Sequence, residues 1–99
     1  MKRHISIDIE TFSSIDIGKS GLYKYAQSPD FSILLFAYSI DGGEVSIIDL
    51  TKEKLSEELI NILIDENFIK HAYNAAFEWY CISKYLGFDE TQRNKWVSQ

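Results

Sequence analysis

The sequence lacks several features that mark particular classes of protein. Its single cysteine, Cys81, has no partner for an internal disulfide, which fits a reducing compartment. Basic residues are few, 10 against 15 acidic ones, and the net charge of -5 argues against a general duplex-binding module, because such modules cluster basic side chains against phosphates. No apolar run approaches the ~18 residues of a membrane helix, and no stretch has the pattern of a signal peptide. We therefore expect a cytoplasmic protein without membrane contact.

What the sequence does contain is typical of a small globular protein. Hydrophobic residues make up 45% and aromatic residues 14% of the 99 positions, which excludes disordered, collagen-like and coiled-coil classes. A chain of this length forms one domain at most, with a small core. No internal repeat, low-complexity segment or linker divides it, so we expect one continuous unit over residues 1–99.

Three segments predict an antiparallel β-meander. Residues 4–11, "HISIDIET", alternate isoleucines with polar residues at the period of a strand. Residues 31–40 and 44–50 are rich in β-branched and aromatic residues, and the D-G-G sequence between them predicts a hairpin turn. The first half of the chain therefore predicts three strands.

The segment between the first two predicted strands, residues 12–30, contains two glycines and the single proline. These residues favour turns, so we expect a long connection with a short helix around residues 22–26. Connections of this length in compact domains often carry functional residues.

The second half of the chain predicts two helices with a strand between them. Apolar residues fall at the helical period after Thr51, the expected N-cap, and again over residues 75–86, where Gly87 ends the helix. Residues 67–73 predict the strand. The order β-β-β-α-β-α predicts an α/β fold with an α+β mixed sheet, in which a three-stranded antiparallel meander is followed by a crossover to a parallel strand. Residues 88–99 predict no cap, turn or element of their own.

Two carboxylates, Asp8 and Glu10, interrupt the isoleucines of the first predicted strand. Residues two apart in a strand share a face and lie about 7 Å apart along the chain, so both side chains can reach one metal ion. Hard divalent cations such as Mg²⁺ prefer carboxylate oxygens, and paired metals recur in nucleases and polymerases. The alternative is that this pair is only the polar face of an edge strand.

A second polar group lies within residues 71–80, "HAYNAAFEWY", where the fourth predicted strand meets the second helix. The start of the helix would direct Glu78 toward the end of the first strand and so add a third carboxylate. The alternative gives both polar residues a structural role, with Asn74 as the N-cap and Glu78 complementing the helix dipole.

Taken together, these segments resemble a known family. The stretches "DIETFSS", "GLYKYAQSPDFSILLFAYSID" and "HAYNAAFEWYCISKYLG" are similar to the N-terminal part of the proofreading 3'-5' exonuclease domain of family A DNA polymerases, particularly of phages and prophages. The resemblance covers Arg3 to Gly87 and includes two exonuclease motifs in the right order. It implies an incomplete ribonuclease-H-like fold of the D-E-D-D superfamily, a partial domain over residues 1–99 that lacks the C-terminal strand, helix and last motif.

The resemblance also implies a metal site for two Mg²⁺ or Mn²⁺ ions. Asp8 and Glu10 match the first motif, and Glu78 stands where the second motif usually carries the shorter aspartate. Residues 85–89, "YLGFD", match the Y-x-x-x-D spelling of the third motif, but they follow Glu78 too closely to leave room for the intervening strand and helix. We therefore expect the fourth carboxylate to be absent and the isolated chain to be inactive or nearly so.

The substrate that the resemblance implies is a frayed single-stranded DNA 3' end, with a nucleoside monophosphate as the product. Asn74 matches a position expected to contact the DNA strand. The backbone at Thr11 would approach the terminal nucleotide, and Phe12 would pack against its base. Aromatic stacking can supply affinity for a single strand despite the acidic net charge.

Two other functions fit the same residues. One is a standalone ribonuclease-H-like nuclease, and the other is a non-catalytic prophage remnant. Apolar surface left uncovered by the missing segment would also favour self-association.

Overall fold

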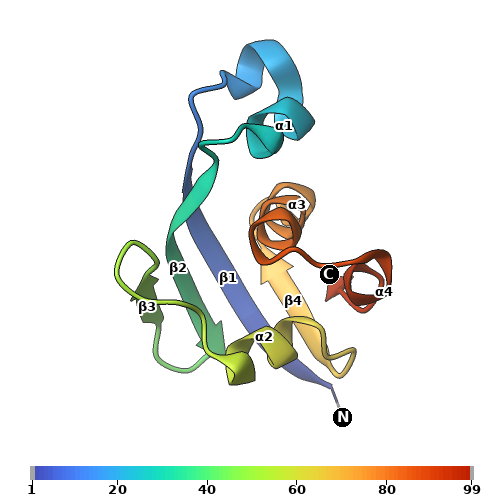
Figure 1. Cartoon of the computed structure of the whole chain (residues 1–99). Coiled ribbons are helices and arrows are strands. Elements are labelled where there is room, and N and C mark those ends of the chain that lie inside the picture. Colours follow the sequence, from blue (N-terminus) through green and yellow to red (C-terminus); the bar gives the residue numbers. More distant parts are fainter. Residues whose placement is uncertain (1, 99) are drawn as a thin grey trace.

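The structure, a computed structural model, describes residues 2–98. None of the helices in this part of the chain has the length and the apolar character needed to cross a membrane. The elements, in chain order (Figure 1), are β1 (Arg3–Phe12), α1 (Ile17–Gln27), β2 (Ser32–Ile40), β3 (Ser46–Asp49), α2 (Glu57–Leu63), β4 (Phe68–Ala72), α3 (Ala75–Leu86), α4 (Glu90–Arg93) and β5 (Val97–Ser98).

The strands form one mixed sheet in the order β3-β2-β1-β4-β5. β2 pairs antiparallel with β1 and with β3, whereas β4 pairs parallel with β1, and β5 pairs parallel with β4. The antiparallel meander and the crossover to a parallel strand are therefore confirmed, as is the α/β class. This arrangement is compatible with an incomplete ribonuclease-H-like fold.

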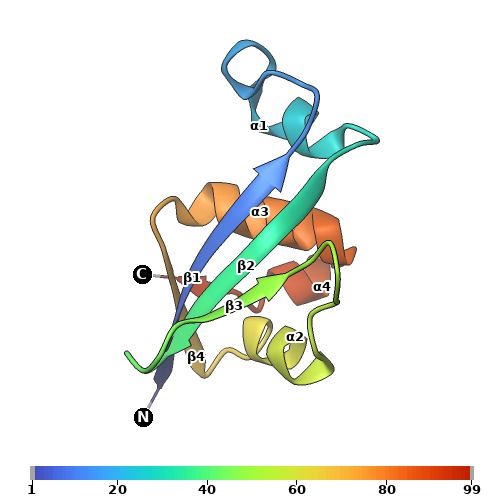
Figure 2. The ribbon, with the colours of Figure 1, turned by 90° about the vertical axis from the view of Figure 1, so that its left-hand side faces the viewer.

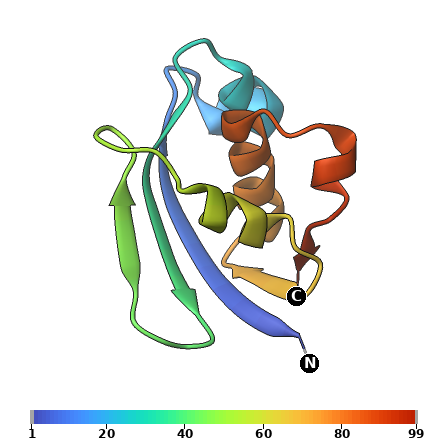
Figure 3. The same ribbon diagram turned by 60° about the horizontal axis from the view of Figure 1, so that its bottom comes forward.

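The alternation of residues in β1 decides which face of the sheet is buried. Ile5 and Ile7 are buried, whereas Ser6 and Asp8 are exposed. Figure 3 shows α2, α3 and α4 together on one side of β1, β2 and β3, and Figure 2 looks onto the other side of these strands. One cluster makes the core between sheet and helices: Ile5, Ile7, Ile33, Phe36, Leu55, Leu59, Leu63, Phe68, Ile82 and Phe88.

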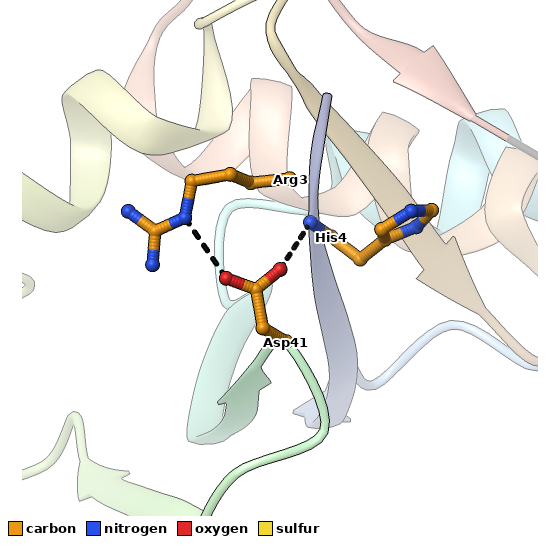
Figure 4. A network of polar contacts seen from close by, with 3 residues as sticks. All are labelled: Arg3, His4 and Asp41. Atoms are coloured by element: carbon orange, nitrogen blue, oxygen red, sulfur yellow. Dashed lines mark hydrogen bonds and ion pairs between the residues drawn. The ribbon is translucent and has the colours of Figure 1, made fainter. Parts of the chain in front are cut away.

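The turn between β2 and β3 is tied to the start of β1. Asp41 (φ 52°) and Gly42 (φ 74°) both adopt the left-handed backbone that a tight hairpin turn requires. The Asp41 carboxylate accepts hydrogen bonds from the backbone amide of His4 and from Nε of Arg3, both at 2.9 Å (Figure 4). These bonds, the His4 amide first, hold the pKa of Asp41 below its ordinary value. Because the ion pair is exposed, it contributes little to stability, and its main effect is to help fix the register of β1 against β2.

Helix α1 is longer than the short helix predicted around residues 22–26. Asp16 caps its start by accepting hydrogen bonds from the backbone amides of Gly18 at 2.8 Å and Lys19 at 3.3 Å. The helix is kinked at Gly21, whose φ of 85° lies outside the helical region. The glycines hid this helix in the sequence because they are the residues that usually mark loops.

Thr51 is not the N-cap of α2, and that prediction was wrong. The cap is Ser56, whose hydroxyl accepts a hydrogen bond from the Leu59 amide at 3.1 Å, and two glutamates follow in the first turn. Acidic residues at this position complement the helix dipole and favour the later start. The Thr51 amide instead donates to the Asp49 carboxylate at 3.0 Å, which holds it in the turn after β3.

The prediction that residues 88–99 form no cap, turn or element was also wrong. Helix α3 ends as predicted at Gly87, whose φ is 70°. Asp89 then caps α4 through a capping box with Gln92, and β5 pairs with β4. A capping residue followed three positions later by glutamine is a recognisable helix start, so this signal was present in the sequence.

The start of α2 can be tested with two alanine variants. Ser56→Ala removes the acceptor for the Leu59 amide and should lower the free energy of unfolding by about 1 kcal/mol. Thr51→Ala should cost less, because it keeps the Thr51 amide and removes only the exposed hydrogen bond from the Thr51 hydroxyl to the Asp49 carboxylate. Urea unfolding followed by circular dichroism measures both, and a larger loss for Thr51→Ala would contradict the observed boundary.

Candidate functional site

The candidate site lies where β1 extends past its parallel neighbour β4. The pairing of these two strands ends at Ile7 and Ala72, so the last part of β1 has no β4 residue beside it. After β4 the chain turns almost directly into α3 (Figure 1). The first turn of α3 therefore lies beside the C-terminal half of β1, where Asp8 and Ile9 act on the carboxyl group of Glu78.

Asn74 and Glu78 form a reciprocal cap at the start of α3. The Asn74 side-chain oxygen accepts a hydrogen bond from the Phe77 backbone amide at 3.2 Å. The backbone amide of Asn74 in turn donates a hydrogen bond to Glu78 Oε2 at 3.3 Å. Asn74 is thus the N-cap that the structural alternative predicted. Its side chain remains exposed, so this role does not bury it.

Glu78 is the buried member of the site. Its side chain is only 4% exposed, and Oε1 has no hydrogen-bond partner among residues 2–98. Burial raises the pKa of the Glu78 carboxyl above its ordinary value. The negative charge of Asp8 raises this pKa further, and the backbone amides of Asn74 and Ile9 offset part of the rise. A buried carboxylate with an unpartnered oxygen beside another negative charge is an environment that a cation stabilises.

Asp8 lies on the exposed face of β1, as the alternation predicted. It stands opposite Ala37 of β2 and lines a hollow of about 260 Å³ together with Ser6 and Val45, among other residues. This hollow opens on the side of the sheet away from the main core. Asp8 is therefore accessible, while its charge acts on the buried Glu78.

Glu10 is exposed on the same face of β1 as Asp8. Across residues 2–98, no three acidic, histidine or cysteine side chains come together in an arrangement that could hold a metal ion. Of the two acids of β1, Asp8 is the one whose charge raises the pKa of Glu78. The cluster of three carboxylates stays a prediction.

A β-bulge lies directly beside these acids. Glu10 pairs with Leu35 and Thr11 pairs with Ile33, so Leu34 of β2 is the extra residue. Bulges redirect neighbouring side chains and are common next to active sites. Because of the bulge, the regular alternation that places Glu10 does not determine the orientation of Thr11.

Thr11 and Phe12 differ in their surroundings. The Thr11 hydroxyl lies 2.8 Å from the hydroxyl of Tyr25, whose ring lies near Phe31 and Phe77. These contacts hold α1 against the end of β1 and the start of α3. Phe12 is 49% exposed, so its ring is accessible to a ligand.

Residues 85–89 match the Y-x-x-x-D pattern, and the tyrosine and aspartate of this pattern both have structural roles. Tyr85 packs against the core in the last turns of α3, and Asp89 is the N-cap of α4. Neither residue lies at the junction of β1 and α3. These positions agree with the interpretation that the spelling is coincidental.

Comparison with known proteins finds similarity to DNA polymerases. No protein-family model matches it. The DNA polymerase of Bacillus phage SP02 is 52% identical over 83 residues, which make up 83% of this chain and 13% of that polymerase. The chain is therefore homologous to a segment of a phage DNA polymerase and spans about an eighth of its length.

The fold is similar to that of a polymerase among the solved structures. The family B DNA polymerase from the hyperthermophilic archaeon Pyrobaculum calidifontis matches 100% of this chain with a TM-score of 0.51, at 18% identity and over 13% of its own chain. At this identity the likeness concerns the fold alone.

The raised pKa of Glu78 predicts how stability depends on pH. Since the folded state favours the protonated carboxyl, the stability it provides is complete below the ordinary pKa and is lost as the pH rises through the raised value. Glu78→Gln removes the ionisable group, and with it this loss of stability at higher pH. It should increase the free energy of unfolding at about pH 8 by on the order of 1 kcal/mol, and should give no such gain at about pH 3.

Urea unfolding at the two pH values measures this difference. Glu44→Gln, at an exposed loop position, is the matched control and should leave the pH dependence unchanged. If Glu78→Gln and the parent chain lose stability in parallel between the two pH values, the raised pKa is contradicted.

Proposed function

We propose that this chain is part of the 3'-5' proofreading exonuclease domain of a phage-type family A DNA polymerase. The observation that carries the proposal is the buried Glu78 carboxyl, with its raised pKa and unpartnered Oε1, beside Asp8. Homology to a segment of a phage DNA polymerase supports the polymerase context. The strand order, compatible with a ribonuclease-H-like fold, supports a nuclease site at this position.

The donor set suits a hard divalent cation, Mg²⁺ or Mn²⁺. Asp8 and Glu78 offer carboxylate oxygens, and no protein donor in the described part of the chain satisfies Glu78 Oε1. These two residues would hold the cation, and Glu10 would add a third carboxylate from the same face of β1. Such ions, when bound, supply Lewis acidity toward a phosphodiester. The three acids do not converge on one point among residues 2–98, so a site of three carboxylates would require a rearrangement on binding.

The other predicted residues would position a single-stranded DNA 3' end. The exposed ring of Phe12 would stack on the terminal base, and the backbone at Thr11, fixed through Tyr25, would lie along the terminal nucleotide. The exposed side chain of Asn74 would contact the strand. Stacking and a few polar contacts suit an acidic chain because they need little neutralisation of phosphates. The product would be a nucleoside monophosphate.

A Mn²⁺ titration of the ¹⁵N-labelled chain tests the cation site. Paramagnetic broadening should concentrate at the amides of Asp8, Ile9, Glu10 and Glu78. Asp8→Asn should weaken Mn²⁺ binding by about tenfold, because it removes a charged oxygen ligand.

Glu53→Gln is the control for this titration, since Glu53 is an exposed acid in the turn after β3. It should leave both the broadening and the affinity unchanged. Broadening spread evenly over the exposed acids, or an unaltered affinity in Asp8→Asn, would overturn the assignment.

The chain by itself should release little or no nucleoside monophosphate from a 3'-labelled single-stranded oligonucleotide with Mn²⁺. The reason is that residues 2–98 hold no preformed set of three acids. Gel analysis of the products measures the release. Sustained release that disappears in Asp8→Asn would instead identify a self-sufficient nuclease, the standalone alternative.

A further inference from the structure

A second hollow lies against the C-terminal half of α3, away from the acids. Its volume is about 470 Å³, and it lies between α3, the turn that follows it and α4. Ser83 follows Glu78 by five residues, which corresponds to about 7.5 Å along the helix axis and to a different helix face. The lining residues are Tyr80, Ser83, Lys84, Gly87, Phe88 and Arg93.

Ser83, one of the lining residues, carries an unpartnered polar group. Its side chain is 4% exposed, and Oγ has no hydrogen-bond partner among residues 2–98. A serine inside a helix usually bonds back to the carbonyl one turn earlier, but this bond is not formed. The Ser83 carbonyl is already used, because it accepts from the Phe88 amide at 2.9 Å and from the Gly87 amide. The Ser83 hydroxyl is therefore a buried donor without a partner in the described part of the chain.

The charges around the hollow are all positive. Lys84 and Arg93 line it, and neither forms an ion pair within the described part of the chain. Arg93 donates one N–H from Nη1 to the Phe88 carbonyl at 2.9 Å, which orients the guanidinium and leaves its other donors available. No acidic residue lines the hollow, although the chain as a whole carries a net charge of -5.

The fourth polar group is also a donor. The Tyr80 hydroxyl accepts a hydrogen bond from Gln27 Nε2 at 3.3 Å, so its own proton is free to be donated. The Tyr80 ring is held in place by an edge contact with Tyr23 of α1, with ring centres 4.8 Å apart. Four residues with side-chain donors, and no acidic residue, thus line the hollow.

We propose that this hollow binds a phosphate group. A phosphate presents only acceptor oxygens and negative charge, which match two cations and two hydroxyl donors. The phosphate could belong to the backbone of a nucleic acid strand or to a free nucleotide. This site requires neither Asp8 nor a divalent cation, so it stands apart from the proposed exonuclease site.

The test is an NMR titration of the ¹⁵N-labelled chain without divalent cations. The probes are inorganic phosphate, thymidine monophosphate and a short oligothymidylate. Saturable shifts should be confined to the Ser83–Phe88 amides and the Arg93 side chain. Lys84→Gln and Ser83→Ala should weaken binding, Lys84→Gln by about tenfold because it removes a charge-assisted hydrogen bond. Lys52→Gln, an exposed cation away from the hollow, should have no effect.

The three probes distinguish the sources of the phosphate. Competition between oligothymidylate and inorganic phosphate for the same shifts identifies a strand phosphate, whereas binding of the two small probes alone identifies a free nucleotide or phosphate. Both results support the site. Shifts that grow linearly with probe concentration at all basic residues, or that persist unchanged in both variants, would overturn it. Lys84 is exposed, so its variant keeps the fold while testing the charge.

Discussion

The parallel pairing of β4 with β1 is the constraint on which the candidate site depends. It ends at Ile7 and Ala72, and α3 begins three residues after β4 ends. This short connection leaves the first turn of α3 near the part of β1 that extends past β4, where the charge of Asp8 acts on Glu78. A shift of β1 by one residue would turn its acids toward the helices and its isoleucines toward the open face, because side chains alternate along a strand.

Under the proposed function, the requirements of folding and of cation binding compete at Glu78. For folding alone the residue is unfavourable, because burial and the charge of Asp8 both oppose its ionisation. The amide of Asn74 satisfies one carboxylate oxygen, and the other is left without a partner. A bound cation would make ionised Glu78 favourable at this position, since it favours the ionised form of both carboxylates. Local conflicts of this kind are expected at functional sites, where one rule of stability is broken for a purpose.

Local patterns in the sequence predicted the helices and strands whose formation depends mainly on neighbouring residues. The alternation around Asp8 gave β1 and its exposed acids, and the residues from Asn74 to Gly87 gave α3 with both caps. Elements with competing signals were predicted only in part, such as α1, of which only the segment after the kink at Gly21 was expected. The burial of Glu78 could not be predicted, because it requires β4 and α3 to be placed against β1. The contact between Tyr25 and Thr11 is of the same kind, since it closes a long connection.

The carboxyl pKa of Glu78, measured by ¹³C NMR with and without saturating Mg²⁺, tests the central claim most directly. Without the cation we predict a pKa above the ordinary glutamate value, because the group is buried beside Asp8. With Mg²⁺ we predict that the pKa falls, and that Asp8→Asn removes most of this fall. An ordinary pKa that Mg²⁺ does not change would contradict the claim that Glu78 and Asp8 form a cation site.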